Sequence, residues 1–133
     1  MITHLFFDAG NTLVHPNLEL VAEVVTRHGA PVSAAALEAA ELHARAVLDH
    51  PDIIRDTTDH TRWLLYFERI LGRCGVTDTA VVRSSLEELK ARHRKDNLWE
   101  RVPADVPATL ARLQGRFRLA VISNANGTVR DKL

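Results

Sequence analysis

The chain has a single cysteine, Cys74, and cannot form an internal disulfide. Disulfide-stapled secreted domains are thereby excluded, and a reducing compartment, the cytoplasm, is predicted. Lys+Arg and Asp+Glu both number 17, so no excess charge favours nucleic acid or a membrane surface. No apolar run approaches the ~20 residues that span a bilayer, and no secretory signal is visible at the start. We expect a cytoplasmic protein with no nucleic-acid or membrane partner.

Aromatic side chains are also scarce, at 5% of 133 residues, and three of them recur at helical spacing. These are Trp63, Tyr66 and Phe67, which we interpret as packed helix core rather than a substrate platform. The length fits one domain, or a small domain that carries an insertion.

Two apolar runs each lead to polar side chains. Residues 3–7 predict a buried strand that delivers Asp8 to its end, and residues 119–122 predict a second strand that leads to Ser123 and Asn124. Parallel neighbours need a crossover connection, which the intervening chain supplies. The carboxyl ends of such strands form the crevice where open α/β sheets bind ligands. A ligand site is therefore predicted at this edge.

Helical periodicity fills the chain between the two strands. Four helices are predicted across residues 17–97, with no strand signal among them, and a fifth over residues 103–113. Residues that favour helix N-termini stand before three of the first four: Asn17, Ser33, and Thr77 or Asp78. The third helix is predicted to run from about Thr58 to Arg73. Breakers follow three of the helices: Gly29, Pro51 and Gly115.

The order of these parts resembles the haloacid dehalogenase superfamily of hydrolases, and the resemblance spans all 133 residues. The first motif of that family is a hydrophobic strand followed by Asp-x-Asp-x-Thr, which residues 8–12 (Asp-Ala-Gly-Asn-Thr) match in part. The second is a strand that ends in Ser or Thr, matched by Ser123 with Asn124 following.

The resemblance implies an α/β fold with two domains. Residues 1–16 and 98–133 would form a partial doubly wound parallel core of the Rossmann-like kind. Residues 17–97 would form an inserted all-α helical cap, which in the family selects the substrate. The implied substrate is a small phosphorylated or related molecule.

The same resemblance implies a role for each motif residue. Asp8 would be the nucleophile that forms a covalent intermediate, and its carboxylate would bind Mg²⁺ together with the backbone carbonyl of Gly10. Ser123 and Asn124 would hold the non-reacting phosphate oxygens of the substrate, and Thr12 would hold the loop in place.

The chain departs from the family at Gly10, which stands where phosphatases of this family carry an acidic residue. That acid protonates the leaving alcohol, and a positioned acid–base group is worth about 10²–10⁴ in rate. Relatives that break carbon–halogen or carbon–phosphorus bonds also lack an aspartate there. Phosphatase-type chemistry and these two alternatives therefore stay open.

A second departure is that the sequence reaches Leu133 without the family's third and fourth motifs, a lysine and further acidic metal ligands. We expect a chain truncated after the second motif, with impaired or no activity as it stands. The alternative is a non-catalytic remnant or interaction module. An exposed strand edge pairs readily with another chain, so we also expect a homo-oligomer or a domain swap.

Overall fold

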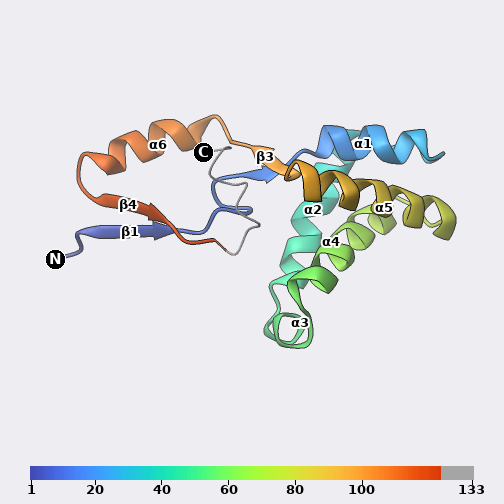
Figure 1. Ribbon diagram of the computed structural model, residues 1–133, viewed down its shortest axis with the longest axis horizontal. Helices are drawn as coiled ribbons and strands as arrows, with labels where there is room; N and C mark the ends of the chain where they lie inside the picture. The colour runs from blue at the N-terminus through green and yellow to red at the C-terminus, as the bar shows by residue number, and fades with distance from the viewer. Residues whose placement is uncertain (124–133) are drawn as a thin grey trace. The chain divides into compact units, whose positions relative to one another are not determined.

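The computed structural model describes residues 1–123, which form a mixed α/β structure with four short strands and six helices (Figure 1). The chain divides into two compact units. The first, here called the sheet unit, comprises Met1–Asn17 and Arg92–Leu133, and the second, the helical unit, comprises Leu18–Ala91. Within the described residues, no helix is both long and apolar enough to cross a membrane. The Rossmann-like core remains a prediction.

A two-stranded parallel sheet forms the centre of the sheet unit. Strand β1 (His4–Phe7) pairs with β4 (Arg118–Val121) in a register that joins their first residues and their last. Helix α6 (Asp105–Gln114) precedes β4 and packs against it (Figure 1). The two predicted strands and their parallel pairing are confirmed, with β4 beginning one residue earlier than predicted.

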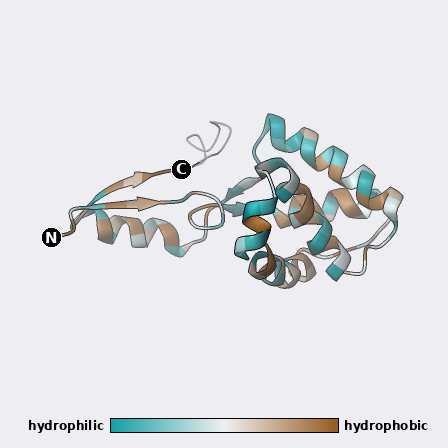
Figure 2. Ribbon diagram, turned by 90° about the horizontal axis from the view of Figure 1, so that it is seen from below, coloured by the Kyte–Doolittle hydropathy of each residue, from teal (hydrophilic) through white to brown (hydrophobic). Residues whose placement is uncertain are grey.

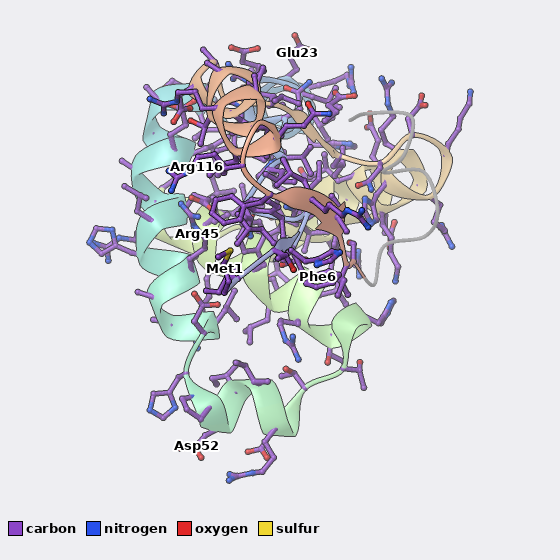
Figure 3. All side chains as sticks on the ribbon, turned by 90° about the vertical axis from the view of Figure 1, so that its left-hand side faces the viewer. Met1, Phe6, Glu23, Arg45, Asp52 and Arg116 are labelled. Atoms are coloured by element: carbon purple, nitrogen blue, oxygen red, sulfur yellow. The ribbon has the colours of Figure 1, made fainter. Side chains whose placement is uncertain are left out.

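The expectation that the first strand is buried is wrong. No residue of β1 is buried, and Phe6 is 64% exposed. Beyond the end of β4, Ile122 is 65% exposed. The physical reason is that two strands and one helix leave the second face of the sheet open. Both strands carry hydrophobic residues along this sheet (Figure 2), and Phe6 is marked in Figure 3.

A second pair of strands was not predicted. Strand β2 (His15–Pro16) runs antiparallel to β3 (Trp99–Arg101). The Asn17 backbone N–H donates to Leu98 O at 2.8 Å, and its side-chain Nδ2 donates to Glu100 Oε1 at 2.7 Å. These bonds join the end of the first segment of the sheet unit to its second segment.

Helix α2 has the most partners among the helices of the helical unit. Helix α2 contacts α1, α3 and α4. The bounds of the five helices that build it are α1 Leu18–Arg27, α2 Ala34–Leu48, α3 Pro51–Asp56, α4 Asp59–Arg73 and α5 Thr79–Lys95, whose last residues belong to the sheet unit.

Capping side chains fix where three of these helices begin. Ser33 Oγ accepts the Ala36 N–H at 3.2 Å, and Asp78 Oδ1 accepts backbone N–H groups of the first turn of α5 at 2.8 and 3.1 Å. Thr58 and Thr61 form a reciprocal capping box before α4. These bonds satisfy amides that have no partner inside the helix.

The prediction that Pro51 ends the second helix is wrong. Helix α2 already ends at Leu48, and Pro51 is the first residue of the short helix α3. Proline fits that position because its fixed φ suits a helix and the first turn needs no backbone donor.

The aromatic cluster forms part of the helical core, as predicted. Phe67 is fully buried, and its ring centroid lies 4.7 Å from that of Trp63 and 4.9 Å from that of Tyr66. The Tyr66 ring meets Phe67 edge-on at 84°, a geometry that aromatic pairs favour.

Candidate functional site

The polar residues that follow β1 and β4 lie at the same end of the sheet. The register pairs Phe7 with Val121, and the Ile122 N–H donates to Phe7 O at 2.8 Å, which continues the ladder by one step. Asp8 therefore comes directly after one strand and Ser123 shortly after its parallel neighbour. Both residues are exposed. Asn124 lies outside the described residues.

The carboxylate of Asp8 is oriented by its own chain. Its Oδ1 accepts the Ala9 backbone N–H at 2.8 Å, within a side chain otherwise open to solvent. A carboxylate with one oxygen held by an amide presents its second oxygen in a defined direction. This is the arrangement that an oxygen nucleophile or a ligand of a hard cation requires.

The loop after Asp8 is a tight turn built on one carbonyl. The Ala9 C=O accepts backbone N–H groups from Thr12, Leu13 and Val14 at 3.3, 2.9 and 3.0 Å. Thr12 thus takes part in the loop through its backbone, while its side chain is exposed. Ala9 and Val14 are both fully buried, so the turn is anchored in the interior of the sheet unit.

Gly10 has room for a side chain. Its φ lies outside the left-handed region, and a β-carbon added there would lie 3.8 Å from Trp99 Cδ1 and 3.9 Å from Trp99 Nε1. These are ordinary van der Waals distances. Neither backbone strain nor crowding therefore requires glycine at this position.

Trp99 is a residue of this site that the sequence analysis missed. Its Nε1 donates to Asn11 Oδ1 at 2.8 Å, and its ring packs against the buried Ala9 and Val14. The one signal in the sequence is a tryptophan inside the polar run 96–101. Nothing in the sequence indicates that it meets a residue 88 positions earlier.

His93 packs against the Trp99 ring, and its burial affects its ionisation. The His93 ring meets the Trp99 ring at 67° with centroids 5.6 Å apart, and His93 Nδ1 accepts the Leu98 N–H at 3.2 Å. Burial lowers the pKa of His93 below its ordinary value, because the interior disfavours the charged ring. The ring is thereby kept neutral as a hydrogen-bond acceptor.

The donors available for Mg²⁺ near this loop are oxygens, the type this ion prefers. They are the carboxylate of Asp8 and the backbone carbonyl of Gly10. Mg²⁺ is commonly held by one or two carboxylates together with waters and substrate phosphate, so this donor set fits the ion. In the part of the chain that the structure describes, no group of three or more His, Cys, Asp or Glu residues could hold a metal ion.

Comparison with known proteins gives no family assignment. No protein-family model matches the chain, and no curated protein shows significant similarity to it.

Proposed function

We propose that this chain carries the nucleophile-bearing part of a hydrolase of the haloacid dehalogenase type, acting on small phosphorylated molecules. The observation that carries the proposal is the placement of Asp8. It is exposed, it follows a strand, and that strand is the parallel neighbour of the strand that leads to Ser123. Ligands of open α/β sheets bind at this end of the strands.

The chemistry proposed for Asp8 is a displacement at phosphorus. The carboxylate oxygen not held by the Ala9 amide attacks phosphorus, and the bond from phosphorus to the leaving oxygen breaks. Water then attacks the aspartyl phosphate, releases inorganic phosphate and regenerates the carboxylate. The hydroxyl of Ser123 would donate to a non-reacting phosphate oxygen.

Asp8 and the Gly10 carbonyl would hold Mg²⁺, which supplies charge neutralisation of the phosphate when bound. Gly10 offers no acid for the leaving group. The proposal therefore favours substrates whose leaving group departs as a stable anion. Carbon–halogen and carbon–phosphorus cleavage share this feature and remain alternatives.

The test is an Asp8→Asn substitution assayed with p-nitrophenyl phosphate and Mg²⁺, with Asp52→Asn on exposed α3 as the matched control. Without the third and fourth motifs the Mg²⁺-dependent phosphate release of this chain is expected to be impaired. We expect Asp8→Asn to abolish what release there is and to prevent formation of an acid-stable phosphoryl adduct detectable by mass spectrometry. Activity that survives in Asp8→Asn would remove this residue from the mechanism.

The outer edge of β1 favours a second function, an interaction module that binds another copy of the chain. Thr3 O and Phe7 O accept from the β4 side, so the backbone groups of His4 and Phe6 face the outer edge of β1. An antiparallel copy centred on Phe6 would place each His4 opposite an Asp8. Within residues 1–123 no strand pairs with this edge, and such edges are pairing sites.

Sedimentation equilibrium distinguishes this second function from the first. We expect the native chain to be dimeric and a Phe6→Ser variant to be monomeric. Leu42→Ser, at a side chain 62% exposed on α2, is the control and should not change the mass. A monomeric native chain at micromolar concentration would rule out the interaction module.

A further inference from the structure

Trp99, a residue distant in the sequence, contacts the loop after β1. Its indole Nε1 donates to Asn11 Oδ1 at 2.8 Å, and its ring packs against Ala9 and Val14. The ring edge lies 3.8 Å from where a β-carbon on Gly10 would stand. One indole therefore borders every residue from 9 to 11.

Asn11 is the residue of this loop whose backbone conformation is least favourable. Its φ is +57°, and it is the only non-glycine residue with positive φ among residues 1–123. Asparagine tolerates this region better than most residues, but glycine adopts it freely. The Asn11 N–H donates to Val14 O at 2.8 Å, so this conformation closes the turn.

Trp99 is itself held firmly enough to fix the position of Asn11. Its backbone N–H donates to Asn97 Oδ1 at 3.1 Å, and β3 is paired with β2. The edge-on contact with His93 supports the ring. Apart from its packing against Ala9 and Val14, the indole is thus held toward Asn11 by contacts outside the loop.

We propose that Trp99 is a positioning residue for Asp8 and acts through Asn11. The inference rests on the proposed role of Asp8. The hydrogen bond holds Asn11 in its left-handed conformation, and this conformation sets the direction of the Gly10 carbonyl and of the Ala9 N–H that orients the Asp8 carboxylate. Without the bond the loop relaxes, and both oxygen ligands move from the geometry that binds Mg²⁺.

The first part of the test measures the loop directly by amide hydrogen exchange in the whole chain. Trp99→Phe keeps an aromatic ring and removes the N–H, so exchange at the Asn11 and Val14 amides should rise about fivefold, the effect of one net hydrogen bond. Trp63→Phe makes the same change in the helical unit and should leave these amides unchanged. Unchanged exchange in Trp99→Phe overturns the proposal.

The second part measures Mg²⁺ affinity from the shift of the Gly10 amide resonance during titration with the metal alone. Trp99→Phe should weaken binding about fivefold by the same argument. Adding Asn11→Gly should restore the affinity, because glycine adopts the conformation without help from the indole. If Trp99 had a purely structural role, Asn11→Gly would not restore the affinity. A double variant that binds Mg²⁺ as weakly as Trp99→Phe would therefore contradict the proposal.

The two parts also separate this inference from the proposed function. If Mg²⁺ shifts no resonance near Asp8 in the native chain, the proposed metal site fails, and the positioning role fails with it. If native Mg²⁺ binding is lost in Asp8→Asn but unchanged in Trp99→Phe, the proposed function stands and only the role of Trp99 is wrong.

Discussion

Tyr66 donates its phenolic O–H to Glu41 Oε1 at 2.9 Å, and both side chains are buried where α4 packs on α2. Arg45 Nε lies 2.8 Å from the same oxygen. Burial raises the pKa of Tyr66 above its usual range, and the Glu41 charge raises it further, whereas Arg45 acts in the opposite direction. The tyrosine is therefore a permanent donor to a buried carboxylate.

Removing this donor should destabilise the helical unit. Tyr66→Phe leaves the buried Glu41 carboxylate with one fewer hydrogen bond, and a bond to a charged group contributes about 1.5–3 kcal/mol. The loss should appear in urea denaturation followed by circular dichroism. Arg55→Gln breaks two exposed ion pairs on α3, with Asp52 and Asp56, and should change the free energy of unfolding by less than about 0.5 kcal/mol. Equal effects of the two substitutions would refute a stabilising role for the buried bond.

A carboxylic acid at position 10 should change which substrates react. A β-carbon at position 10 meets Trp99 only at ordinary van der Waals distance, so the first atom of an aspartate side chain fits there without strain. An acid there could protonate a poor leaving group and raise kcat/KM for alkyl phosphates by up to about 10²–10⁴. Hydrolysis of p-nitrophenyl phosphate, whose leaving group needs no proton, should change little.

Gly10→Asn is the matched control for that experiment because it has the same shape and no acidic proton. The measurement is the ratio of kcat/KM for the two substrate types. If the Asp and Asn variants give the same ratio, position 10 does not act in proton transfer.

His93 should make the stability of the sheet unit depend on pH. Burial lowers its pKa in the folded chain, so the unfolded chain binds the proton more readily. Stability is therefore retained at neutral pH and falls as the pH drops below about 6.5, the ordinary histidine value. His93→Gln should flatten the stability profile between about pH 7 and 5. His43→Gln, at an exposed site on α2, should not, and a profile unaltered by His93→Gln would show that His93 does not titrate on unfolding.

The helices other than α3 could be predicted because their signals are local. Ser33 and Asp78, both among the predicted caps, satisfy amides within the first turns of α2 and α5, so sequence alone indicates where those helices begin. The parallel pairing of β1 with β4 also followed, since two apolar runs separated by helices have few other ways to pair. The role of Pro51 was predicted wrongly because proline both interrupts helices and is favoured as the first residue of a helix.

What escaped prediction depends on partners distant in the sequence. Strands β2 and β3 are two and three residues long and mostly polar, and each is extended only because it pairs with the other. The Trp99–Asn11 bond depends on that ribbon in turn. At the candidate site, the parallel pairing of β1 and β4 places Asp8 and Ser123 at one end of the sheet. No local sequence pattern indicates that Trp99 contacts the loop after Asp8.

The bond between the Asn17 N–H and Leu98 O has a consequence for protein engineering. The bond brings Asn17 and Leu98 side by side, so residues 18–97 form one long connection between the paired strands β2 and β3. A short turn joining Asn17 to Leu98 would close β2 onto β3 without it. We therefore expect a fusion across these two adjacent junctions to keep the pairing of β2 with β3 and to lose the contacts that His93 and Asn97 make with Trp99.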